Sequence, residues 1–206
     1  SLNKNTADNN TTVGHSSLAC NTSGASNVAV GMQALFKNTT AIDNTGIGLN
    51  ALCNNTTGEK NTAIGRSALN VNSEGSLLTA VGHSALKANT TGSNSTAVGM
   101  QALFKNTTGA SNVAVGLNAL CNNATGASNT AVGSCALKVN TASNNTAVGI
   151  SALTANTTGG ANTALGRQSL KANTSAANNV AVGNNSLAAN TTGANNTALG
   201  AESLDT

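Results

Sequence analysis

A glycine that follows a short aliphatic segment returns with a 17-residue period along this 206-residue chain, and this period restricts the possible folds. One interval, between Gly133 and Gly149, is a single residue shorter than the others and has lost that residue within 141–145. A period this short and regular predicts stacked coils, none of which could fold alone. We therefore expect an all-β protein, a parallel β-solenoid or β-roll of about twelve 17-residue coils. The repeating glycines are Gly14, Gly31, Gly48, Gly65, Gly82, Gly99, Gly116, Gly133, Gly149, Gly166, Gly183 and Gly200.

The composition argues against an ordinary globular core. The chain has no Pro, Trp or Tyr and two Phe, and most of its 39% hydrophobic content is alanine. We predict a single repeat array over residues 11–206, preceded by an incoming segment or partial coil at 1–10. We find no signal-peptide pattern and no apolar run long enough to cross a membrane. The sequence stops in mid-coil two residues after Leu204, so we expect a fragment of a longer fibre.

Each coil contains a short segment with the pattern of a β-strand. The residue before the glycine is always Val, Ile or Leu, and the residue two positions earlier is Thr or Val. These two residues share one face of a strand, and Ala occupies the position between them in ten of twelve repeats. We expect Val98 and its equivalents to face the coil interior. The alanines, such as Ala63, Ala97 and Ala131, would then face outward, where another subunit can approach closely.

A leucine four residues after each glycine, such as Leu103, is the second predicted interior anchor. An asparagine seven residues after the glycine leads into a Thr-Thr-Gly turn or a close variant. Stacking would align these asparagines into a ladder whose side-chain amides bond up and down the rod. For the segment around the leucine we favour a second short strand in each coil, with a helical turn as the alternative.

Two large side chains in each coil bury little apolar surface compared with the length of chain that must be ordered. An isolated chain of such coils therefore buries too little apolar surface to be stable on its own. Several chains that share a core would remedy this, so we expect an oligomer.

The repeat also carries a family resemblance. Residues 144–149 read Asn-Asn-Thr-Ala-Val-Gly and are followed by a small residue near Leu. This pattern resembles the Asn-Ser-Val-Ala-Ile-Gly coils of YadA-like trimeric autotransporter adhesin heads, and it is similar to the Asn-Thr-Ala-Ile-Gly repeats of bacteriophage tail fibre proteins. The resemblance implies a left-handed β-roll, a homotrimer, and a place in a virion fibre or at the cell surface. It also implies cell adhesion or host recognition, with a cell-surface glycan or a matrix protein as partner.

The repeats differ from one another mainly at positions one, two, five and six after the glycine, which we expect to form one edge of the rod. Seven of the nine basic residues lie there, together with both Met and both Phe residues. Such an edge could attract anionic glycans; a solvated edge, or aromatic residues that cover a subunit seam, are the alternatives. The candidate partner-binding residues are Met32, Phe36, Lys37, Arg66, Lys87, Met100, Phe104, Lys105, Lys138, Arg167 and Lys171.

The four cysteines form an even set, but the period keeps them apart. Cys53 and Cys121 occupy the same column four coils apart, which is about 19 Å at ~4.8 Å per coil. Cys20 lies two coils from Cys53, and Cys135 is out of column with Cys121. We expect four free thiols, which suit a protein assembled in a reducing cytoplasm, as a phage fibre is.

The sequence offers no catalytic constellation. His15 and His83 share a column without a recurring Asp, Glu, Cys or Ser group beside them, and no glycine loop precedes a helix. We therefore expect no enzyme activity, cofactor or metal site, and no nucleic-acid partner, since the net charge is only +3.

A fibrous structural or adhesion segment is the favoured function. An ice-binding β-solenoid and an inert spacer shaft are the alternatives. An ice-binding face requires threonines that point the same way. Adjacent threonines such as Thr107 and Thr108 point in opposite directions in an extended chain, which argues against ice binding.

Overall fold

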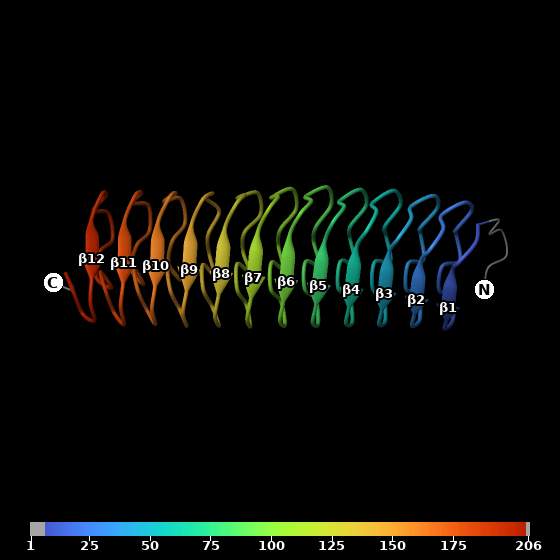
Figure 1. Ribbon diagram of the computed structural model, residues 1–206, viewed down its shortest axis with the longest axis horizontal. Coiled ribbons are helices and arrows are strands. Elements are labelled where there is room, and N and C mark those ends of the chain that lie inside the picture. The colour runs from blue at the N-terminus through green and yellow to red at the C-terminus, as the bar shows by residue number, and fades with distance from the viewer. Residues whose placement is uncertain (1–6, 205–206) are drawn as a thin grey trace.

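The computed structural model describes residues 7–204, which form a single rod of stacked coils (Figure 1). Each coil contributes one three-residue strand, and the strands form one twelve-stranded parallel sheet in sequence order. The predicted all-β parallel solenoid is therefore confirmed. The strands are β1 (Thr11–Val13), β2 (Val28–Val30), β3 (Thr45–Ile47), β4 (Thr62–Ile64), β5 (Thr79–Val81), β6 (Thr96–Val98), β7 (Val113–Val115), β8 (Thr130–Val132), β9 (Thr146–Val148), β10 (Thr163–Leu165), β11 (Val180–Val182) and β12 (Thr197–Leu199).

Neighbouring strands pair with the offset that the period requires. Thr96 of β6 pairs with Val113 of β7, one full period further along the chain. Between β8 and β9 the offset is one residue shorter, since Thr130 pairs with Thr146. The strands keep their register across the short interval, so the missing residue is absorbed in a turn.

Of the incoming segment predicted at 1–10, residues 1–6 lie outside the described range. Asn10 donates from Nδ2 to the carbonyl of Gly24 at 2.8 Å, and its Oδ1 accepts from the amide of Asn27 at 2.9 Å. The asparagine that precedes the strand makes the same contacts in later coils, so residues 7–10 pack as the end of a coil.

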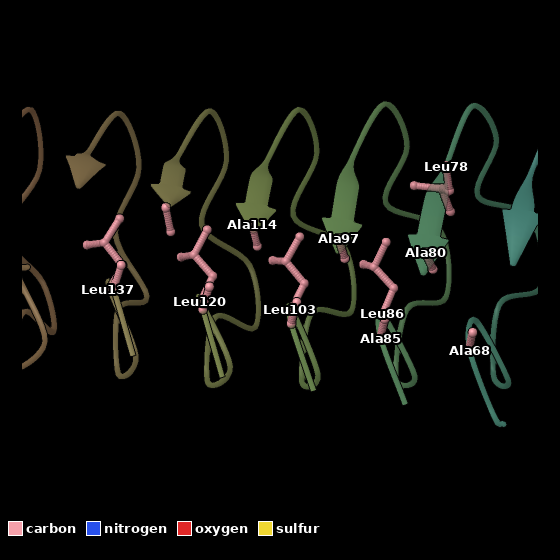
Figure 2. Packing of buried hydrophobic residues seen from close by; sticks show 14 of the residues in the cluster. Ala68, Leu78, Ala80, Ala85, Leu86, Ala97, Leu103, Ala114, Leu120 and Leu137 are labelled. Carbon is pink, nitrogen blue, oxygen red and sulfur yellow. The ribbon is translucent and has the colours of Figure 1, made fainter. Parts of the chain in front are cut away.

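The interior of each coil is filled by alanine from the strand and leucine from the facing wall (Figure 2). Ala97 and Leu103 are both completely buried, which confirms the prediction for Leu103. The prediction that Val98 faces the interior is wrong, because 37% of its surface is exposed. The prediction of an outward alanine face is also wrong, since Ala63 and Ala131 are fully buried as well.

The narrow space between the strand and the leucine explains this inversion. At β3 the middle residue is Gly46, and a methyl group placed there would lie 3.3 Å from Cγ of Leu35. Little more than a methyl group fits between the two walls, so alanine takes the inward position in most coils. Strand side chains alternate, and the larger Thr, Val and Ile residues on either side of the alanine therefore point outward.

In the described residues, the segment around each leucine is neither a second strand nor a helical turn, so both predicted alternatives are wrong. Leu103 has a φ of 52° and Gln101 has a φ of 56°, and the equivalent residues of the other coils repeat these left-handed values. The amide of Leu103 still donates to the carbonyl of Ala119, and that of Gln101 to the carbonyl of His83, both at 3.0 Å. Left-handed backbone costs roughly 1–2 kcal/mol per residue. Burial of the leucine and the bonds between coils offset this cost.

Two ladders of asparagine run through the interior. Asn106 donates from Nδ2 to Oδ1 of Asn89 in the preceding coil at 2.9 Å, which confirms the predicted ladder. Sequence reasoning missed the second ladder, formed by the asparagine that precedes most strands. There Asn112 donates to the carbonyl of Gly126 at 2.8 Å, and its Oδ1 accepts from the amide of Asn129 at 2.9 Å. Both ladders satisfy backbone groups of the turns that would otherwise be buried without partners.

Candidate binding surfaces

The outward side of the sheet carries two columns of side chains and no charged residue. We call the first and third residues of β1–β12 the sheet face. The first residue of each strand is Thr or Val, and the third is Val, Ile or Leu, as in Thr62 and Ile64 of β4. Several third residues are more than one-third exposed, for example Ile64 at 39% and Leu165 at 46%. An aliphatic column therefore runs along the whole rod, over roughly 53 Å at ~4.8 Å per step.

In some coils the residue directly after the glycine adds an exposed apolar side chain beyond the sheet face. Met32, Met100, Leu117 and Ile150 are all exposed at this position. Exposed aliphatic surface that continues over so many coils is uncommon on a monomeric protein and marks a site of interaction.

The predicted partner-binding residues all reach the surface, but they fall into two groups along the coil. One group directly follows the glycine, and the other lies beyond the buried leucine, at positions five and six. Most are exposed, whereas Phe36, Lys87 and Phe104 are half-buried. The first group is Met32, Arg66, Met100 and Arg167, and the second is Phe36, Lys37, Lys87, Phe104, Lys105, Lys138 and Lys171.

One basic residue of this set has a partner within the chain. Nζ of Lys87 lies 5.7 Å from the ring centroid of Phe104 on the next coil, a cation–π contact. Among residues 7–204 no basic side chain forms an ion pair, and the acidic residues Asp43, Glu59 and Glu74 lie in the turns that follow the asparagine ladder. The positive charge of the second group is therefore not neutralised by the chain itself.

A groove opens where the large residues of this second group give way to alanine. It has a volume of about 550 Å³ and extends across three coils, from Thr154 to Ala189. Sequence reasoning identified only Lys171 of its lining. The small residues that replace the usual large ones at positions five and six could have revealed it. We call it the alanine groove, and its lining includes Ala155, Ala172, Ala188, Gln168, Lys171 and Asn185.

The four cysteines are free. Burial raises the pKa of the Cys53 and Cys121 thiols above the ordinary value, and the nearby Lys37 and Lys105 only partly oppose this. These two thiols are protonated at neutral pH, so neither is an activated nucleophile. In the part of the chain that the structure describes, no group of three or more His, Cys, Asp or Glu residues could hold a metal ion.

Comparisons with protein-family models, with curated proteins and with solved structures found no match. The class of this protein is therefore defined by its own fold, which is that of a β-solenoid repeat protein. Its two candidate binding surfaces are the sheet face and the alanine groove. Within residues 7–204 no helix is long and apolar enough to cross a membrane.

Proposed function

We propose that this chain is a structural and adhesive segment of a fibre, in which three copies associate through their sheet faces and present the variable side of the rod outward. The aliphatic column of the sheet face carries this proposal. It extends over all twelve strands, and no other part of residues 7–204 covers it. The resemblance of the repeats favours a phage virion or a bacterial surface as the place of such a fibre.

Association through the sheet face removes aliphatic surface from water. If each of twelve third-position side chains loses about 30 Å² of exposed area, the gain is roughly 9 kcal/mol per copy at about 25 cal/mol per Å². This is comparable with the association cost of about 4–15 kcal/mol, and the threonine methyl groups add to it. The face carries no charge, so no ion has to be desolvated.

The proposed seam lies on the Thr and Val side of the strand, not on the alanine side expected from the sequence. Ala97 is enclosed in its own coil and has no surface to offer another subunit. Three parallel copies around a common axis would bring the same coil of each copy to the same height. Side chains of the aliphatic column that lie near the threefold axis would then meet their own equivalents, and the closed ring would leave no sheet face uncovered.

The oligomeric state tests this proposal. Sedimentation equilibrium should give three times the chain mass of 20.0 kDa. Val98→Lys places a charge on the sheet face and should lower the mass to that of one chain. Asn94→Lys, on an exposed turn, is the matched control and should leave the trimer intact. A monomeric mass for the unaltered chain would overturn the proposal.

One observation favours ice binding as a second candidate function. Nine of the twelve first strand residues are Thr, and they point outward at the strand spacing of ~4.8 Å. Turn threonines such as Thr107 are not part of this array, since the hydroxyl of Thr107 donates to the carbonyl of Ala124 at 3.0 Å. Thermal hysteresis from a monomeric sample would favour ice binding, and a trimer without hysteresis would favour the fibre. A trimer that attaches to nothing would be an inert spacer.

A further inference from the structure

The alanine groove forms where small side chains replace larger ones at two fixed positions of the repeat. Positions five and six after the glycine hold Phe104 and Lys105 in one central coil. Near the end of the chain position six is alanine in three successive coils, Ala155, Ala172 and Ala189, and in the last of these position five is alanine as well, Ala188. Because the coils stack in register, these reductions fall side by side and leave a space of about 550 Å³.

The lining combines an apolar floor with polar side chains whose hydrogen-bonding capacity is unused. The alanine methyl groups form the apolar part, and Gln168, Lys171 and Asn185 bring two amides and an ammonium group. Within the described residues, the side chains of these three residues make no hydrogen bond or ion pair. Together they can donate several hydrogen bonds to a ligand.

The backbone beneath these side chains is fixed. The amide of Gln168 donates to the carbonyl of Ile150, and the amide of Asn185 donates to the carbonyl of Arg167, both at 2.9 Å. Both residues have left-handed φ values, 56° and 54°. The donors therefore sit on a scaffold that is already ordered, which lowers the entropic cost of binding a ligand.

The charges around the alanine groove favour an anionic group at one end. Lys138 and Lys171 lie in the same column, two coils or roughly 10 Å apart, with Thr154 between them. Among the described residues, the carboxylate of Glu202 follows Asn185 one coil further along its own column. An anion is thus attracted to the Lys171 end of the groove and repelled from the Glu202 end.

From this arrangement we propose that the alanine groove binds a saccharide residue that carries a carboxylate, as a uronic acid does. The apolar face of the sugar ring packs on Ala172 and Ala188, its hydroxyl groups bond to the amides of Gln168 and Asn185, and its carboxylate accepts a charge-assisted hydrogen bond from Lys171. This inference rests on the proposed adhesive function and names the ligand class for it. The other basic residues of the chain then have no direct part in recognition.

Calorimetric titration of the full chain with trigalacturonic acid tests the proposal, with maltotriose as the uncharged comparison. Lys171→Ala should weaken binding at least tenfold, because it removes the one cation in the groove. Ala188→Phe should weaken it as strongly by filling the groove, and the fold should accept this change because Phe104 occupies the same column. Lys105→Ala removes an exposed charge outside the groove and should change the affinity by less than twofold.

Three outcomes would overturn the proposal: no binding of trigalacturonic acid at millimolar concentration, equal binding of maltotriose, or equal weakening by Lys105→Ala and Lys171→Ala. Circular dichroism checks the fold of each variant, and if Ala188→Phe does not fold, the comparison of the two lysine variants decides. Sedimentation equilibrium of the same samples tests the trimer independently of saccharide binding, so failure of the groove and failure of the proposed function can be told apart. A trimer that binds no saccharide refutes only the groove.

Discussion

Asn156 donates its side-chain amide to Oδ1 of Asn140 at 2.7 Å, but Asn140 does not continue this contact to Asn123 in the coil before it. Asn106 donates both to Asn89 and to the carbonyl of its own turn, whereas in the short coil Asn140 keeps only the bond within its turn, to the carbonyl of Ala142 at 2.7 Å. Oδ1 of Asn123 is left buried without a hydrogen-bond partner. A buried acceptor in this state costs roughly 1–3 kcal/mol, so the short coil is a weak junction in the stack.

Insertion of one threonine between Thr141 and Ala142 restores the 17-residue period and should repair this junction. We expect the free energy of unfolding to rise by about 1–2 kcal/mol, because Asn140 can then donate to Asn123. Urea denaturation measures the change. The same insertion after Thr107, in a coil of normal length, should destabilise the chain. If both insertions destabilise it equally, the short coil is not strained.

The inward position of alanine predicts opposite effects for two adjacent residues. Ala97→Val adds two methyl groups to a filled space and should destabilise the fold by about 1–3 kcal/mol. Thr96→Val changes an outward residue to one already found at Val28, Val113 and Val180, and should change stability by less than about 0.5 kcal/mol. Thermal unfolding of the two variants compares them. A neutral Ala97→Val variant would contradict the packing of the interior.

Leu103→Asp should open the coils on either side of it, because an unpaired charge would be buried between the walls. Leu103→Met keeps the volume and should cost less than about 1.5 kcal/mol. Hydrogen exchange by mass spectrometry should show lost protection centred on the altered coil, since each coil contacts only its neighbours. Unchanged melting of the Asp variant would refute the assignment of Leu103 to the core.

The period predicts which residues align from coil to coil, but it does not predict which side of the strand faces the interior. Counting along the repeat was enough to place Leu103 in the interior and to align Asn106 with Asn89. Counting could not decide between Ala97 and Val98, because hydrophobicity favours the larger residue inside. The width of the coil, set by the leucine of the facing wall, favours the smaller one.

Two other features, the backbone conformation at Leu103 and the alanine groove, were not predicted, for different reasons. Leucine disfavours left-handed backbone, so nothing in the sequence indicated that Leu103 would adopt a φ of 52°. The alanine groove depends on which side chains are missing from a column, and it appears only when positions five and six are compared across coils. The sequence therefore identified Lys171 as one of many basic residues and not as part of a groove.

The thiols provide a prediction that depends on pH. Alkylation without reductant, after unfolding, should modify all four cysteines, and detection of an intrachain disulfide would contradict the register of the coils. In the folded chain Cys20 is exposed and should react faster than Cys53 and Cys121, whose pKa values are raised by burial. A raised pKa in the folded state stabilises the fold at low pH. Its contribution should be lost as the pH rises above about 9 through the folded pKa. Replacement of Cys53 and Cys121 by serine should reduce this loss.

Removal of residues 82–148 joins Val81 to Gly149 in register and deletes four coils. Because each coil contacts only its neighbours, the shortened chain should fold and form a trimer. Small-angle X-ray scattering should show a rod shorter by roughly 19 Å. The alanine groove lies outside the deleted block, so binding of trigalacturonic acid should persist. Loss of folding would show that the coils are not independent units.

The hydrogen bonds between coils run along the rod, and this direction determines how the protein responds to force. Tension between the two ends loads the bonds of a terminal coil first, not those of all twelve strands together. Each 17-residue coil that opens releases about 55–60 Å of chain in place of ~4.8 Å of rod. A solenoid held at its ends would therefore lengthen in small steps, dissipate work over a distance many times its own length, and wind up again when the load is removed.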